Sequence, residues 1–90
     1  AGGDRDVSAV RVVLADDLDL LRDGVASILG ADPGIEIVGE ASSGSSAVAA
    51  VRALAPDVVL MDVEMPGGGL AATREILASC SGTRVLVLTM

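Results

Sequence analysis

The sequence contains no histidine, lysine, phenylalanine, tyrosine or tryptophan, and its one cysteine is Cys80. Without histidine, a Ser-His-Asp or Cys-His catalytic unit cannot form, and neither can a histidine-ligated metal site. A single cysteine cannot form an internal disulfide, which is consistent with a reducing cytoplasm. No apolar run approaches the roughly 20 residues that a membrane-spanning helix needs. We therefore expect a cytoplasmic protein that does not engage membranes.

Acidic residues dominate the charge of the chain. Thirteen Asp and Glu residues stand against six basic residues, all arginine, which gives a formal net charge of −7. A surface of this sign repels nucleic-acid phosphates, so we do not expect these residues to bind DNA or RNA directly. Half of the chain, 51%, is apolar, and its core must consist of valine, leucine, isoleucine, alanine and methionine. That composition is ample for one domain of 90 residues.

Short apolar runs alternate with helical patterns along the chain. We expect strands at 10–15, 35–41, 58–62 and 84–90, and helices at about 18–30, 47–55 and 70–80. Such alternation predicts an α/β fold, a doubly wound parallel sheet with helices on both faces. Segment 35–41 alternates apolar with polar residues, as expected of an edge strand. Residues 1–9 lack periodicity and are interpreted as a disordered leader or an expression remnant, followed by one domain over residues 10–90.

Carboxylates follow two of the predicted strands at the point where each ends. Asp16 and Asp17 end the first strand, and Asp62 ends the third. If these strands are neighbours, with the second strand outside the first, the three carboxylates converge at the switch point where ligands bind. Their mutual repulsion favours a hard cation such as Mg²⁺, which one or two carboxylates usually hold. Asp62 is then available as a nucleophile, and Thr89, ending the fourth strand, can donate to a phosphoryl oxygen.

Three segments together resemble the receiver domain of two-component response regulators. They are VVLADD at 12–17, DVVLMDVEMP at 57–66 and VLVLT at 85–89. The resemblance covers residues 10–90 and implies a flavodoxin-like (CheY-like) fold with strand order 2-1-3-4, the fifth strand of the family having no counterpart in these residues. Segments 18–28 and 37–41 look more particularly like the NarL/FixJ (LuxR-type) subfamily.

The resemblance implies a role for each candidate residue. Asp62 would be the phosphoacceptor, taking its phosphoryl group from a sensor histidine kinase. Asp16, Asp17 and Asp62 would hold Mg²⁺ together with the backbone carbonyl of Glu64, and Thr89 would be the switch hydroxyl. The domain would be regulatory and not an enzyme beyond its own phosphorylation and dephosphorylation. In this subfamily the receiver usually precedes a helix-turn-helix domain, so the protein would regulate transcription and contact DNA only through a C-terminal domain absent from these residues.

Two departures from the family pattern affect this interpretation. The segment Gly67-Gly68-Gly69 is one residue shorter than usual after Met65-Pro66 and lacks the family's acidic residue. The last helix-strand-helix of the family, with its lysine and switch aromatic, has no counterpart here, so residues 10–90 would form the N-terminal part of a receiver domain. The uncharged strand at 85–89 would also invite pairing with another copy, which makes a homodimer an expected partner.

Two other functions stay open at this point. One is a Mg²⁺-dependent phosphatase or phosphotransferase with Asp62 as transient nucleophile, resembling haloacid-dehalogenase-type hydrolases, in which Glu64 would occupy the place of the second acid. The other is an interaction module that is never phosphorylated. The plainer interpretation of the Asp pair is also structural, since Asp17 can cap the helix that follows. Cys80 is interpreted as a small core residue.

Overall fold

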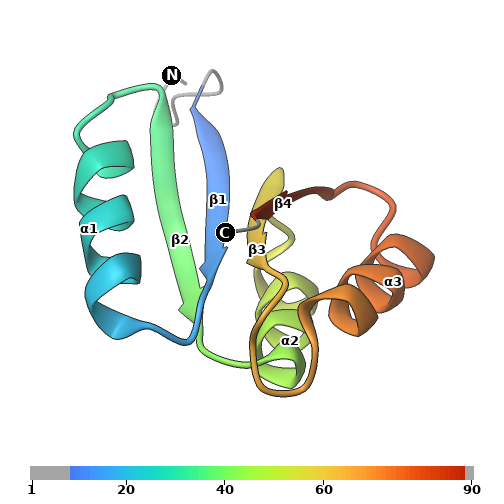
Figure 1. Ribbon diagram of the computed structural model, residues 1–90. Coiled ribbons are helices and arrows are strands. Elements are labelled where there is room, and N and C mark those ends of the chain that lie inside the picture. The colour runs from blue at the N-terminus through green and yellow to red at the C-terminus, as the bar shows by residue number, and fades with distance from the viewer. Residues whose placement is uncertain (1–8, 89–90) are drawn as a thin grey trace.

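The computed structural model of the protein describes residues 9–88, in which strands and helices alternate strictly (Figure 1). The elements are β1 (Val10–Ala15), α1 (Asp19–Gly30), β2 (Ile35–Ala41), α2 (Gly44–Leu54), β3 (Val58–Asp62), α3 (Gly69–Ser79) and β4 (Arg84–Leu88). Every predicted strand and helix is therefore present. Most of the predicted leader, residues 1–8, and the last two residues of the predicted fourth strand lie outside the described residues.

The four strands form one parallel sheet in the order β2-β1-β3-β4. This is the predicted order, and it places β2 at an edge, as its alternating pattern indicated. The chain winds outward from β1 to β2 and then back across to β3, so β1 and β3 are neighbours at the point where the winding reverses. Ligands bind beyond the carboxyl ends of strands at such a point in open α/β sheets.

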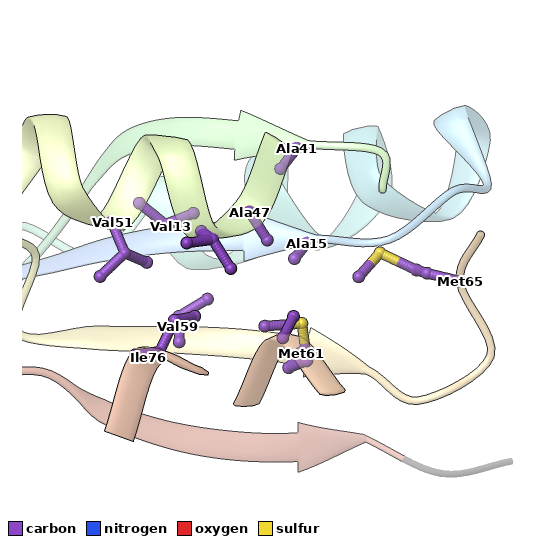
Figure 2. Packing of buried hydrophobic residues seen from close by; sticks show 11 residues of the cluster. Val13, Ala15, Ala41, Ala47, Val51, Val59, Met61, Met65 and Ile76 are labelled. Atoms are coloured by element: carbon purple, nitrogen blue, oxygen red, sulfur yellow. The ribbon is translucent and has the colours of Figure 1, made fainter. Parts of the chain in front are cut away.

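The core lies between the sheet and the two helices α2 and α3, while α1 lies on the other side of the sheet (Figures 1 and 2). Both central strands contribute to it, and small side chains from α2 fill the space above them. The buried cluster consists of Val13, Ala15, Ala41, Ala47, Val48, Val51, Val59, Met61, Met65, Ala72 and Ile76. As the composition required, it contains no aromatic side chain, and the largest fully buried residue is Met61.

The opposite face of the sheet is covered unevenly. Leu14 on β1 is 3% exposed, whereas Leu86 and Leu88 on β4 are 55% and 43% exposed. No residue of α1 is fully buried, and the apolar side chains of Leu21 and Ile28 are exposed. A lone helix thus covers β1 but leaves β4 open among the residues that the structure describes. Within that same part of the chain, no helix has the length and apolarity needed to cross a bilayer.

Local hydrogen bonds explain where the helices begin. At the start of α2, Ser46 N donates to Ser43 Oγ at 3.2 Å and Ser43 N donates to Ser46 Oγ at 3.0 Å, a reciprocal capping box. The prediction that Asp17 caps α1 is wrong. The N-cap residue is Leu18, which has no side-chain cap, and the carboxylate that serves this turn is Asp16, whose Oδ1 accepts from Leu18 N at 2.9 Å.

β2 contains one extra residue relative to β1. Val12 pairs with Ile37, but Val13 pairs with Gly39, so Val38 has no partner on β1. Bulges of this kind are rare between parallel strands. Gly39, the residue after the bulge, leaves room for α2, because a Cβ there would lie 2.6 Å from the Leu54 Cδ1 atom. Beyond the bulge, β2 resumes regular pairing and ends beside the end of β1.

The packing of α3 generates a stability prediction. Ile76 is fully buried, whereas its neighbour Leu77 is 59% exposed. Ile76→Ala should lower the free energy of unfolding by about 3 kcal/mol, because it leaves a cavity that the small core cannot refill. Leu77→Ala is the matched control and should change this free energy by no more than about 0.5 kcal/mol. Urea titration followed by far-ultraviolet circular dichroism measures both, and equal losses would contradict the described orientation of α3.

Candidate functional site

The carboxylates of Asp16, Asp17 and Asp62 converge beyond the carboxyl ends of β1 and β3. One oxygen atom from each lies within 4.8 Å of the others. The sheet register explains this proximity, since Ala15 pairs with Met61 and each of them is followed directly by an aspartate, Asp16 or Asp62. The structure thus brings together the three side chains that the sequence predicted to meet.

Asp16 is the most constrained of the three. Its backbone N–H donates to Ala41 O at 3.0 Å, its Oδ1 atom accepts from Leu18 N at 2.9 Å, and its carbonyl oxygen accepts from Arg22 Nη1 at 2.6 Å. Asp16 is also 8% exposed, although Asp17 beside it is exposed. The turn after β1 therefore holds Asp16 in place and leaves Asp17 open to ligands.

Asp62 is half-buried, and its carboxylate is held by the same type of hydrogen bond as that of Asp16. Asp62 Oδ1 accepts from the backbone N–H of Glu64 at 3.0 Å, two residues further along the chain. This Asx-type bond repeats the one between Asp16 and Leu18. The ends of β1 and β3 therefore each carry a carboxylate with one oxygen atom held by the turn that follows. Both acceptors, Asp16 and Asp62, are among the predicted site residues.

The remaining predicted site residues are placed less completely. The Glu64 side chain is exposed, and its N–H supports Asp62, while the role of its carbonyl as a metal ligand stays a prediction. Thr89 lies outside the described residues, so its role as switch hydroxyl also stays a prediction. The described part of β4 ends beside the site, because Leu88 pairs with Asp62 and Leu88 O accepts from Val63 N at 3.3 Å.

The short loop after β3 is shaped by glycine. Gly67 and Gly68 adopt positive φ angles of 86° and 79°, in the region that favours glycine. A Cβ on Gly69 would overlap the carbonyl oxygen of Asp62, so α3 begins directly against the end of β3. Pro66 O accepts from Gly44 N at 2.9 Å, which ties the loop to the start of α2. The glycines therefore let a short loop connect β3 to α3.

The three carboxylates form one wall of a groove of about 440 Å³. The rest of its lining is Leu18, Leu21, Val25, Glu64 and Leu88. The carboxylate oxygens are close enough to share one cation, and the groove has room for further oxygen ligands. Hard divalent cations such as Mg²⁺ take oxygen ligands and commonly keep water or phosphate oxygens among them. The donor set thus fits Mg²⁺ together with a phosphoryl group.

Arg22 is a basic residue beside this acidic site that was not among the predicted site residues. Its guanidinium donates to Asp19 Oδ1 at 2.6 Å and to Glu40 Oε1 at 2.8 Å, in addition to the Asp16 carbonyl. The hydrogen bond to Asp19 and then that to Glu40 raise the pKa of Arg22 above its ordinary value, so it stays cationic. The available sequence signal was the spacing of Asp19 and Arg22, three residues apart on one helix.

Comparisons with known proteins identify the family of the chain. Residues 12–90 match the family model described as response regulator receiver domain. Response regulator UvrY from Escherichia coli is 49% identical over 82 residues, and response regulator GacA from Pseudomonas aeruginosa is 45% identical over 82 residues. The transcriptional regulatory protein LiaR from Bacillus subtilis is 46% identical over 81 residues. These matches cover 89–90% of this chain but only 38% of each relative.

Solved structures show the same architecture. A two-component response regulator of the LuxR family from Aurantimonas superposes with a TM-score of 0.86 at 37% identity, covering 92% of this chain and 60% of that chain. The signal receiver domain of the regulator named NarL from Mycobacterium tuberculosis gives 0.86 at 37% identity, covering 91% of this chain and 67% of that chain. The predicted fold class and strand order are therefore confirmed.

The contact between Gly69 and the end of β3 leads to a second prediction. Gly69→Ala should lower the free energy of unfolding by about 2 kcal/mol, because the added methyl group forces α3 away from the Asp62 carbonyl. Gly24→Ala is the control: apart from its chain neighbours and the backbone of its own helix, no atom lies within 4 Å of the new Cβ, and alanine favours the helix by roughly 0.5 kcal/mol or more. Urea unfolding should separate the two by sign. A stabilising Gly69→Ala would show that the loop is not packed as described.

Proposed function

Because this chain belongs to the response regulator receiver domain family, we propose that it is a phosphoacceptor module in which Asp62 takes a phosphoryl group from a sensor histidine kinase. The observation that supports this function best is the convergence of three carboxylates within 4.8 Å at the switch point of the sheet. A phosphoryl group is strongly anionic, so its transfer onto a carboxylate needs a cation held at the same place.

Asp62 suits the nucleophilic role better than Asp16. Asp16 is 8% exposed, and its side chain supports the turn into α1. Asp62 is more accessible, and the Glu64 N–H fixes its Oδ1 atom, which leaves Oδ2 to attack phosphorus. As the new P–O bond forms, the P–N bond of the phosphohistidine breaks, and the imidazole leaves with that electron pair. The fixed Oδ1 limits rotation of the carboxylate, so the attacking oxygen is already oriented.

Asp16, Asp17, Asp62 and the backbone carbonyl of Glu64 would hold Mg²⁺ in this proposal. When bound, the ion neutralises charge on the phosphoryl oxygens and on the carboxylates themselves. Asp17 is the exposed member of the adjacent pair, so it can reach the ion without disturbing the turn that Asp16 supports. Thr89 would donate to a phosphoryl oxygen and so report phosphorylation through its position.

The activity of the whole protein extends this proposal beyond the 90 residues. The chain spans about 38% of the length of the curated relatives it matches, one of which is named a transcriptional regulatory protein. We propose that residues 10–90 are the N-terminal part of a receiver domain in a cytoplasmic transcription regulator. DNA contacts would come from a C-terminal domain, and homodimerisation would accompany phosphorylation. The domain itself would be regulatory and catalyse only its own phosphorylation and dephosphorylation.

Intact mass spectrometry tests the proposed chemistry directly. The purified protein should gain one phosphoryl group when incubated with Mg²⁺ and acetyl phosphate, and Asp62→Asn should gain none because it lacks the nucleophilic oxygen. Glu64→Gln is the matched control. It should be phosphorylated like the wild type, because Glu64 contributes its backbone and not its exposed side chain.

Three results would contradict the proposal. They are phosphorylation of the Asp62→Asn protein, phosphorylation that persists when EDTA removes Mg²⁺, and no phosphorylation of the wild type. Sustained turnover of p-nitrophenyl phosphate would instead favour a phosphatase with Asp62 as a transient nucleophile.

A further inference from the structure

Arg22 joins three separate segments beside the acidic site. Its Nε atom donates to Glu40 at the end of β2, its Nη2 atom to Asp19 in the first turn of α1, and its Nη1 atom to the carbonyl oxygen of Asp16. The side chain is 14% exposed, although Asp19 is 82% exposed and Glu40 is 39% exposed. Each of the three guanidinium nitrogen atoms donates to an acceptor on a different segment, so Arg22 has one orientation relative to them.

The hydrogen bond from Arg22 to the Asp16 carbonyl oxygen also affects the position of Asp17. A peptide unit is planar, so the direction of the Asp16 carbonyl also fixes the direction of the Asp17 N–H and the position of the Asp17 Cα atom. Asp16 is additionally held through its own N–H by Ala41 and through its Oδ1 atom by Leu18 N. Among residues 9–88, the Asp17 carboxylate accepts no hydrogen bond from another residue, so the position from which it reaches the site is set by its backbone and therefore by this peptide unit.

We propose that Arg22 is a positioning residue for the cation site: through the Asp16 carbonyl it sets the direction in which Asp17 presents its carboxylate. The inference rests on the proposed function, because that function assigns a cation to Asp16, Asp17 and Asp62. Arg22 itself contacts neither the cation nor the phosphoryl group. Glu40 and Asp19 act one step further away, by holding the guanidinium in place.

Electrostatics and positioning predict opposite outcomes when Arg22 is replaced. Removing a positive charge near three carboxylates makes the site more attractive to a cation, so charge alone predicts tighter binding by Arg22→Ala. Loss of positioning predicts weaker binding, because the Asp17 carboxylate is then presented in several directions. Arg22→Lys separates the two effects further, since lysine keeps the charge but cannot reproduce the rigid fork.

Titration with Mn²⁺, followed by electron paramagnetic resonance of the free ion, measures the cation affinity. The Kd for Mn²⁺ should rise about tenfold in Arg22→Ala, which is the effect typical of residues that orient metal ligands. Arg22→Lys should also bind more weakly than the wild type. Arg52→Ala is the matched control, because it removes the same charge and a similar ion pair, Arg52–Glu75 at 3.0 Å between α2 and α3. Its Kd should stay within about twofold of the wild-type value.

Tighter or unchanged Mn²⁺ binding in both Arg22 variants would overturn the proposal, and so would equal losses in Arg22→Ala and Arg52→Ala. If Arg22→Ala fails to fold, Arg22→Lys alone decides. If the wild type does not bind Mn²⁺, the cation site of the proposed function is wrong, and nuclear magnetic resonance of the metal-free protein tests Arg22 separately. The backbone order parameter of Asp17 should then fall in both Arg22 variants, and an unchanged value would refute the positioning role.

Discussion

Parallel pairing of β1 with β3 is the constraint on which the rest of the site depends. It sets Ala15 opposite Met61, so the residues that follow them, Asp16 and Asp62, lie side by side at the carboxyl ends of the two strands. Burial of Val13 on β1 and of Val59 and Met61 on β3 beneath α2 and α3 stabilises this register. A slip of either strand by one residue would turn its core side chains toward the face that α1 covers. The hydrophobic core, which Figure 2 shows, thus supplies the free energy that offsets the repulsion among the three carboxylates.

The turns after β1 and β3 restrict the rotation of a carboxylate by the same type of hydrogen bond. A carboxylate at a strand end is free to rotate unless one of its oxygens is engaged. In each turn, a backbone N–H two residues later engages that oxygen, from Leu18 for Asp16 and from Glu64 for Asp62. These donors also offset part of the negative charge before any cation arrives. The site is consequently ordered by its own backbone, and side chains such as Arg22 add direction to it.

Much of the fold was predictable because strong local signals agreed with one another. Apolar runs identified the strands, their alternation with helices gave the parallel sheet, and the strand order placed Asp16, Asp17 and Asp62 together. Features that depend on tertiary geometry were not predictable. A helix pattern cannot show that Asp16 and not Asp17 serves the first turn of α1, nor that Arg22 reaches across to β2. Residues such as Leu21 and Ile28 fit a buried stripe, but burial also requires a neighbour.

The extra residue in β2 has an effect at the far end of that strand. Because Val38 is skipped in the pairing, Glu40 lies opposite Leu14 on the side of α1, and Ala41 lies opposite Ala15 in the core. If Val38 were instead paired with Val13 in a regular ladder, Glu40 would lie opposite Ala15. Its carboxylate would then point into the apolar core, and Arg22 would lose an acceptor. Deletion of Val38 itself would straighten β2 but keep Glu40 opposite Leu14 and Ala41 opposite Ala15, so a strand one residue shorter would present the same side chains to the same faces.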